Sequence, residues 1–381
     1  MRRNVYDDDH EVFRQAVREF VRREVLPHVD DWAVDKGLPR SFWLAAGRQG
    51  LLGLEIPAGY GGSEAGDFRF NAVLMEELAA VNMALPSCVG IHADIVPPYL
   101  VHLASPEVRS EWLPRLSTGE AVAAMAMTEP GAGSDLGAVA TSAVPDGDHY
   151  RINGSKTFIT NGHTADLIVV AARTTPDAGP KGLTLFAVPA DTPGFGRGRK
   201  LDKVGQPESD TAELFFEDVR VPKSYMIGEL DRGFMHMMTW LPQERLSAAV
   251  TNLAHARQMV DETLRYATER TAFGRPVGAF QANKFLFADI VTRLDVTQAY
   301  VDQCVLAHTR GELTPVDAAK AKWWTAQVQN EVLDHCLQLH GGAGYMNEYR
   351  IARAWRDARV TRIWAGSNEI MKEIIGRDLG L

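Results

Sequence analysis

The spacing of apolar residues changes twice along this 381-residue chain, and each change marks a boundary between zones of different structure. From Asp9 to about Leu116, apolar residues recur every three or four positions, which predicts amphipathic helices. Between about Val122 and Val221 they fall into short runs rich in β-branched and aromatic residues, which predicts strands. After Gly228 the helical spacing returns. The expected α+β fold has an N-terminal helical domain (1–121), a middle antiparallel β domain (122–227) and a C-terminal four-helix bundle (228–381).

The N-terminal zone begins with an amphipathic segment. Six apolar residues are predicted to share its buried face: Val12, Phe13, Ala16, Val17, Phe20 and Val21. Breaks are expected at Pro27, Pro39 and the glycine cluster 59–62, and a second helix is expected over 70–81. This zone is therefore predicted to form several short helices.

The middle zone combines strand-forming runs with turn residues. The runs are 150–152, 157–160, 167–171, 183–188 and 212–216. Turn chemistry between them comes from Asn153-Gly154, Asn161-Gly162, Pro145-Asp146-Gly147 and the segment 177–180. These intervals are typical of an antiparallel sheet, so a small β-barrel or sandwich is expected.

The last zone contains helical runs of about 25 residues, which is longer than most helices of globular proteins. The candidates are 234–271, 281–309, 315–339 and 350–375, the last interrupted near Gly366. Long helices joined by short Gly and Pro breaks favour an antiparallel bundle.

Composition excludes several classes of function. The net charge is −9 and no basic pair extends into a long patch, which argues against nucleic-acid binding. No apolar run approaches the roughly 18 residues of a membrane span. Cys88, Cys304 and Cys336 lack paired spacing, so neither a disulfide framework nor a metal site is expected. The N-terminus resembles neither a signal nor a transit peptide, which indicates a cytoplasmic or already processed protein.

A glycine-containing segment, 127–135, lies where the helical zone gives way to strands. Its Gly131-Ala132-Gly133 lacks the third glycine of a dinucleotide fingerprint, and no crossover helix follows, so a Rossmann nicotinamide site is not supported. Two interpretations stay open. It is either a simple turn or a loop whose backbone N–H groups approach a planar or phosphorylated ligand.

Five segments resemble the acyl-CoA dehydrogenase family in order and spacing, and the resemblance covers nearly the whole chain. They are 127–135 (MTEPGAGSD), 156–162 (KTFITNG), 270–276 (RTAFGRP) with Gln281, 338–342 (QLHGG) and 365–369 (AGSNE). Within the family, 211–219, 241–246 and 364–371 are most like the long-chain acyl-CoA dehydrogenases. The family fold of a helical domain, a β domain and a helical bundle agrees with the three zones.

The resemblance implies FAD as the cofactor. Flavin contacts within the subunit are implied for Met125, Ala126, Met127, Thr128, Gly133, Ser134, Phe158, Ile159, Thr160, Ser367, Asn368 and Glu369. Contacts with the FAD of a neighbouring subunit are implied for Arg270, Phe273, Gln281, Gln338, Leu339, His340, Gly341 and Gly342. The family usually has tryptophan or another aromatic residue where Phe158 stands. Such a shared site requires a homo-oligomer, expected to be a tetramer built as a dimer of dimers.

The resemblance also implies the chemistry. Many family members carry a catalytic glutamate where this chain has Ala365, which cannot accept a proton. The long-chain and isovaleryl branches place the base before an arginine, as in Glu244 and Arg245, and Pro242 is expected to kink or start that helix. The alternative is that Glu244 merely pairs with a basic neighbour on a solvated face. The Ala365 N–H is the implied donor to the thioester oxygen.

Acyl-CoA contacts are implied for Ser134, Pro242, Gln243, Arg245 and Gly366. The expected activity is α,β-dehydrogenation of an acyl-CoA to a trans-2-enoyl-CoA, with electrons passed to an electron-transferring flavoprotein, as in fatty-acid β-oxidation. Two alternatives keep the same fold: a flavin-dependent oxidase or N-oxygenase, and a non-catalytic partner subunit. Acyl chain length, branching and the carrier thiol are not determined by the sequence.

Overall fold

The computed structural model describes residues 3–381 and begins with a helical layer. Its α-helices are α1 (Asp8–Phe20), α2 (Val29–Asp35), α3 (Arg40–Arg48), α4 (Phe68–Ala79), α5 (Ala84–Gly90), α6 (Val96–Leu103) and α7 (Pro106–Thr118). Acidic residues in the first turn of α1 favour its N-terminal dipole. Val17 and Phe20 are buried as predicted, but Val12 is 71% exposed, because the buried stripe of α1 runs through His10 and Arg14 instead. The segment Ile91–Ile95 is a π-helical turn, a feature that is frequent at functional sites.

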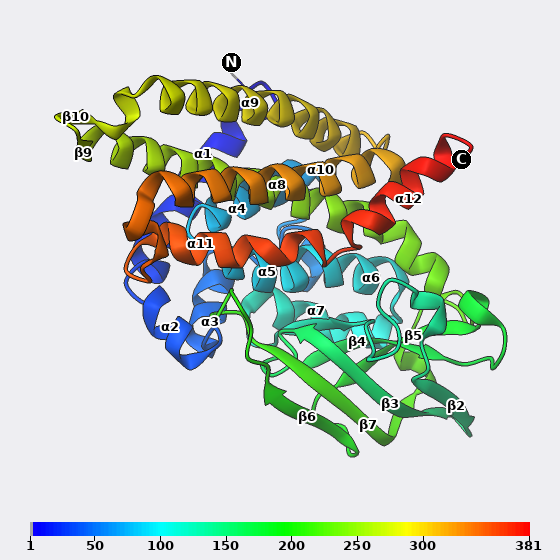
Figure 1. Cartoon of the computed structure of the whole chain (residues 1–381). Helices are drawn as coiled ribbons and strands as arrows, with labels where there is room; N and C mark the ends of the chain where they lie inside the picture. The colour runs from blue at the N-terminus through cyan, green and yellow to red at the C-terminus, as the bar shows by residue number, and fades with distance from the viewer. Residues whose placement is uncertain (1–2) are drawn as a thin grey trace.

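The middle of the chain forms one sheet in the order β6-β7-β3-β2-β4-β5-β8, with β1 beside β4 (Figure 1). The strands are β1 (Ala123–Ala126), β2 (Ser142–Asp146), β3 (His149–Thr160), β4 (Leu167–Arg173), β5 (Leu183–Pro189), β6 (Phe195–Lys200), β7 (Thr211–Pro222) and β8 (Met226–Ile227). Most neighbours are antiparallel, as predicted, but β1 pairs with β4 in parallel, and β2 makes a single parallel bridge to β4. The parallel pairs arise because β4 returns to the sheet after the β2–β3 hairpin.

The turn predicted at Asn153-Gly154 is wrong. Both residues lie inside β3, where the β3–β7 register shifts between Ile152 and Gly154. Gly154 has a φ of 149°, and a Cβ there would lie 2.5 Å from the Thr141 hydroxyl. Close approach of two backbones, rather than a chain reversal, therefore explains this glycine.

The C-terminal part is dominated by long helices. They are α8 (Gly233–Glu269), α9 (Gln281–Thr309), α10 (Pro315–His340), α11 (Arg350–Ala358) and α12 (Asn368–Asp378). The short strands β9 (Thr271–Ala272) and β10 (Arg275–Pro276) pair between α8 and α9. The last predicted helix is divided, since an irregular segment separates α11 from α12. Pro242 does not start α8, which begins at Gly233.

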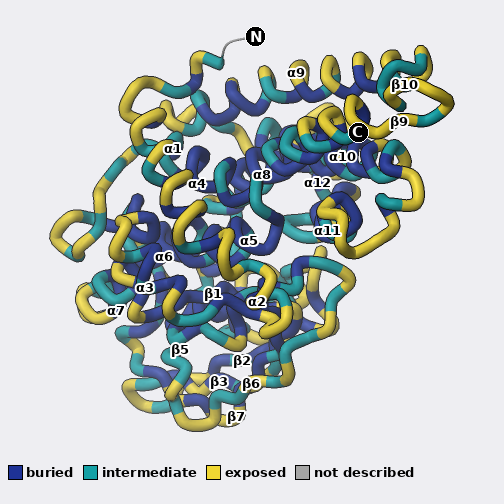
Figure 2. The backbone as a smooth tube through the Cα atoms, turned by 90° about the vertical axis from the view of Figure 1, so that its left-hand side faces the viewer, coloured by how far each residue is buried: buried dark blue, intermediate teal, exposed yellow. Residues whose placement is uncertain are grey.

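Two hydrophobic cores hold these layers together. One core joins the N-terminal helices to the bundle and includes Leu74, Leu246 and Val328. The other joins α6 and α7 to the sheet and includes Leu100, Val169 and Phe186. Figure 2 shows the buried residues running through the central helices and strands, with exposed turns along the outer side of α9. No helix within residues 3–381 is sufficiently long and apolar to cross a bilayer.

Candidate active site

The segment 127–135 is attached to β3 by its backbone and by a buried ion pair. Thr157 N donates to Thr128 O at 2.9 Å. The Lys156 ammonium, which is 1% exposed, donates to Met127 O at 3.0 Å and to Glu129 Oε1 at 2.8 Å. The Glu129 carboxylate also accepts from the N–H groups of Ala140 and Thr141. The sheet thus brings together the two segments predicted to contact a flavin.

The ionisation of this pair follows from burial and charge. Burial disfavours both charged forms, but Lys156 and the hydrogen bonds from 140–141 outweigh it and lower the pKa of Glu129. Burial lowers the pKa of Lys156 to about 8, although Glu129 opposes the shift. Because each charge would be left unsatisfied alone, the pair fixes the shape of the loop.

Phe158 has an unusual backbone and an unusual environment. It occupies the second irregularity of β3, with a φ of 58°, and 67% of the residue is exposed. A positive φ is unfavourable for a bulky side chain and is concentrated at functional sites. Ile159 beside it is buried and Thr160 is half-buried. The bulge therefore leaves an aromatic side chain exposed, one residue after the backbone bond that joins β3 to the 127–135 loop.

The same loop leaves open space. A Cβ built on Gly131 would have no neighbour within 4 Å, and one on Gly133 would meet only Thr128 Cγ2, at 3.9 Å. Ser134 is exposed, whereas Met125 and Ala126 lie buried in β1 and support the loop from below. An open glycine-containing loop beside an exposed aromatic ring fits a planar ligand with phosphates, which includes a flavin nucleotide.

Glu244 lies on α8 and is half-buried. Burial raises the pKa of Glu244 to about 7; the nearby Asp94 carboxylate adds to this shift, while Arg245 and Lys322 oppose it. Tyr99 of α6 is 1% exposed, and its pKa is raised by burial and by the charge of Glu244. A carboxylate that titrates near neutral pH is suited to accept a proton.

The Gln243 side chain is hydrogen-bonded within the protein. Its amide donates to Glu55 Oε1 at 2.8 Å and to Asp94 O and Oδ1 at 3.0 and 2.9 Å. Asn71 donates to the same two carboxyl groups. Burial and the neighbouring Asp94 raise the pKa of Glu55, and burial raises that of Asp94 despite its hydrogen bonds. A pair of acids, of which Asp94 is buried and Glu55 half-buried, therefore anchors α8 one residue before Glu244.

The loop between α11 and α12 approaches α8 from the other side. Ala365 and Gly366 have φ values of 52° and 84°, and Ser367 caps α12 by accepting from Ile370 N at 3.4 Å. A Cβ on Gly366 would lie 2.5 Å from Met371 Cε and 3.9 Å from Arg245 Nη2. Asn368 is buried and Glu369 exposed. The segment that contains Ala365 thus lies beside the arginine that follows Glu244.

A buried lysine links these two segments. Lys322 of α10 donates to Gly366 O at 2.5 Å. Burial and Arg245 lower the pKa of Lys322 to about 7, while Glu244 and Glu369 oppose the shift. Charged side chains of α8 and α12 therefore interact with Lys322, which itself holds the loop.

The remaining predicted cofactor residues gather elsewhere. Arg270, Phe273 and Gln281 lie at the α8–α9 turn, which forms one end of the bundle in Figure 1, away from the sheet. Phe273 is 95% exposed with a φ of 51°. At the same end, the segment 338–342 closes α10, and Tyr266 stacks on His340 with ring centroids 4.2 Å apart. The structure of one chain does not bring this group to the 127–135 loop.

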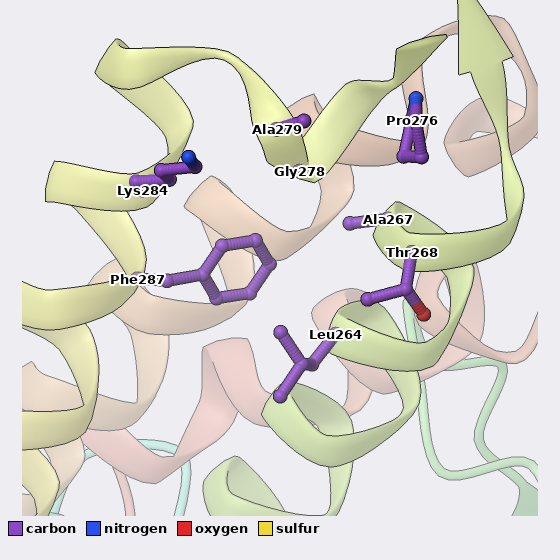
Figure 3. A pocket seen from close by; sticks show the side chains of 8 residues that line it. All are labelled: Leu264, Ala267, Thr268, Pro276, Gly278, Ala279, Lys284 and Phe287. Carbon is purple, nitrogen blue, oxygen red and sulfur yellow. The ribbon is translucent and has the colours of Figure 1, made fainter.

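An apolar pocket of about 430 Å³ lies beside this turn, between α8 and α9 (Figure 3). Its lining consists of Leu264, Ala267, Thr268, Pro276, Gly278, Ala279, Lys284 and Phe287. The pocket is separate from Glu244, because none of its lining residues contributes to the base region.

Sequence reasoning missed Glu55, Asp94 and Lys322. Lys322 could have been found from its spacing, since Ala319, Lys322 and Ala326 recur on the buried face of α10. No local pattern identifies Glu55 and Asp94 as partners, because they belong to different N-terminal segments that are joined through the side-chain amides of Asn71 and Gln243.

Comparison with known proteins identifies the family. The family models described as acyl-CoA dehydrogenase N-terminal, middle and C-terminal domains match residues 7–120, 124–219 and 231–380. The mitochondrial long-chain specific acyl-CoA dehydrogenase of Sus scrofa is 44% identical over 379 residues, covering 99% of this chain and 88% of that protein.

Solved structures agree. An acyl-CoA dehydrogenase from Geobacillus kaustophilus superimposes with a TM-score of 0.97 at 45% identity, covering 99% of this chain and 100% of that one. A prolyl acyl carrier protein oxidase superimposes with a TM-score of 0.93 at 27% identity, covering 99% and 100%. With all three domains matched in order, the chain belongs to the acyl-CoA dehydrogenase family of flavoprotein oxidoreductases.

Proposed function

We propose that this protein is an FAD-dependent dehydrogenase of acyl-CoA thioesters, with Glu244 as its catalytic base. The observation that carries the proposal is the pairing of two features around one loop. Ala365 cannot take a proton, and Glu244, whose pKa is raised to about 7 by burial, lies on the helix beside that loop. A carboxylate with this pKa is ionised in about half of the molecules at neutral pH and still basic enough to remove a proton.

The proposed reaction removes a proton and a hydride from two neighbouring carbons of the substrate. Glu244 removes the proton from carbon 2 of the thioester, and loss of a hydride from carbon 3 leaves a trans-2 double bond. FAD supplies the hydride acceptor when bound. The Ala365 N–H donates to the thioester oxygen, where negative charge develops. Arg245 stays charged at any working pH and orders the base region rather than transferring a proton.

The residues that would hold FAD within one chain are those of the 127–135 loop and the bulge at Phe158. Phe158 offers its exposed face to the ring system, and the loop offers backbone N–H groups. The segments around Phe273 and His340 lie at the far end of the bundle, so we assign them to the FAD of a neighbouring subunit. That assignment requires a homo-oligomer, and we propose a tetramer arranged as a dimer of dimers.

The test compares three variants by anaerobic flavin reduction with a panel of acyl-CoA thioesters. Glu244→Gln is expected to retain FAD and to bind acyl-CoA while reducing flavin at least about 1000-fold more slowly, because the base is lost. Glu244→Asp, which withdraws the carboxylate, is expected to be intermediate. Asp261→Asn on the exposed side of α8 is the matched control and is expected to behave as wild type. Wild-type rates in Glu244→Gln would refute the assignment of the base.

The same experiment separates the alternatives. We propose long-chain substrates, supported by the 44% identity with a long-chain specific relative. Rapid reoxidation of the reduced flavin by air alone would favour an oxidase, the activity named for one structural relative. Failure of every thioester to reduce bound flavin would favour a non-catalytic subunit.

We further propose an electron-transferring flavoprotein as the electron acceptor and the cytoplasm as the location. Family membership supports the acceptor, and the three cysteines, all free thiols, are compatible with a reducing compartment. Anaerobic transfer from the acyl-CoA-reduced enzyme to a purified electron-transferring flavoprotein tests the first point, and cell fractionation tests the second.

A further inference from the structure

Lys322 is the buried cation that the proposed reaction leaves unused. It is 0% exposed, although lysine is almost never fully buried unless it is paired. Lys320, one half-turn earlier on α10, shows the usual behaviour: its side chain is 45% exposed and lies 3.7 Å from Asp317. The burial of Lys322 therefore reflects its own surroundings and not a general property of this helix.

Those surroundings hold a carbonyl rather than a carboxylate. The Lys322 ammonium donates to Gly366 O at 2.5 Å, and within residues 3–381 no carboxylate lies within 4 Å of it. A buried charge without an ion pair is costly in solvation. Because apolar residues of similar volume would fill this space without that cost, a role in stability alone does not explain the lysine.

The carbonyl belongs to a strained loop. Ala365 and Gly366 are consecutive left-handed residues, and this conformation is unfavourable for alanine because of its Cβ. Such a conformation persists only when its surroundings hold it. Two contacts do so here: Lys322 holds the Gly366 carbonyl, and the Ser367 hydroxyl caps α12. The backbone of Ala365 is thereby fixed immediately before the first of these contacts.

The charges around the loop come from several elements. Glu244 and Arg245 face Lys322 from α8, and Glu369 faces it from α12. The pKa of Glu244 is influenced by the charges of Arg245, Lys322 and Asp94, the last of which lies in the π-helical turn. The charge of Glu244 in turn raises the pKa of Tyr99 of α6. Among these groups, Lys322 and Arg245 are the two that favour the ionised carboxylate.

We propose that Lys322 is a positioning residue for the dehydrogenation. Its ammonium holds the Gly366 carbonyl, which keeps the Ala365 N–H directed at the thioester oxygen, and its charge favours the ionised form of Glu244. This inference rests on the function proposed above. It predicts that loss of the lysine impairs turnover more than it impairs binding of FAD or substrate.

The test uses Lys322→Met, which keeps the length of the side chain but neither donates nor carries charge. The variant is expected to keep its FAD and its KM within about threefold, while kcat falls about 10- to 100-fold, as when an oxyanion donor is displaced. The acid limb of its kcat/KM profile is expected to move to higher pH, because removing a nearby positive charge raises the pKa of Glu244. Lys320→Met is the matched control and should resemble wild type.

A second variant and a second substrate separate the two parts of the proposal. Lys322→Arg keeps the charge but moves the donor, so its acid limb should stay in place while kcat still falls. A 3-oxoacyl-CoA can lose its carbon-2 proton without passing on a hydride, and its ionisation is visible by absorbance. Lys322→Met should therefore bind less of this ligand as the enolate at a given pH.

Two results would overturn the inference. The first is a Lys322→Met enzyme with wild-type kcat and an unmoved acid limb. The second is a loss of activity explained entirely by lost FAD or lower thermal stability, with a normal profile per bound flavin; this would make the lysine merely structural. If wild-type enzyme is reduced by no acyl-CoA, the proposed function fails together with this inference. If acyl-CoA reduces the flavin of the wild-type enzyme and the Lys322→Met variant is unaffected, only this inference fails.

Discussion

Replacing Glu244 by glutamine should stabilise the protein above neutral pH while it abolishes turnover. Burial raises the pKa of Glu244 from its ordinary value of 4.5 to about 7, so the folded state binds a proton more tightly than the unfolded chain does. The stability contributed by the protonated form is fully present below pH 4.5 and is lost as the pH rises through about 7. Glutamine remains neutral throughout, so the variant does not undergo this loss.

The magnitude follows from the two pKa values. Their difference, at about 1.4 kcal/mol per pH unit, gives about 3 kcal/mol as the largest loss of wild-type stability between pH 4.5 and pH 8. Glu244 is half-buried and lies beside Lys322, so solvent screening and coupled titration reduce this value. Since a chain of this size shifts its melting temperature by about 2 °C per kcal/mol, we expect Glu244→Gln to gain about 2 to 5 °C at pH 8 relative to wild type.

The assay is thermal unfolding of FAD-saturated wild type and Glu244→Gln from pH 5 to pH 8. The stability advantage of the variant should grow mainly between pH 5 and pH 7 and level off toward pH 8. Asp261→Asn, at an exposed position of the same helix, should show a difference that does not change with pH. If the variant and wild type melt at the same temperature at pH 8, or if their difference in melting temperature does not change with pH, Glu244 is not desolvated in the folded protein.

Three further predictions concern neighbouring contacts. Asp94→Asn should move the acid limb of kcat/KM to lower pH, because the Asp94 charge raises the pKa of Glu244; an unmoved limb in stopped-flow profiles would contradict this. Glu129→Gln should weaken FAD binding about tenfold or more, because the substitution leaves Lys156 buried without its ion pair. Equilibrium dialysis measures the FAD affinity, and an unchanged affinity would contradict this prediction. Phe273→Ala should lower the oligomer mass in light scattering if this exposed ring contacts a neighbouring subunit, and an unchanged assembly would reject that role.

Local sequence patterns predicted most of the secondary structure. The helix expected over 281–309 coincides with α9, because apolar spacing and the Pro and Gly breaks act within a few residues of each other. The same reasoning failed at Asn153-Gly154, where a bulge and a close backbone contact take the place of a turn. It also failed at Val12, because apolar spacing alone cannot tell which flank of a helix meets a neighbour.

The ordered motifs identified the family, and the prediction that Ala365 stands where many members carry an acid follows from that resemblance. The assignments of individual site residues and the domain limits stay predictions. The sequence alone determined the residue types and their order. Helix and strand periods could be predicted from that order because they are local properties. Only the tertiary structure brought Glu55 and Asp94 together at Gln243, and Lys322 to the Gly366 carbonyl. These contacts join segments far apart in the chain, and the pKa of Glu244 depends on the burial and charges that such packing creates.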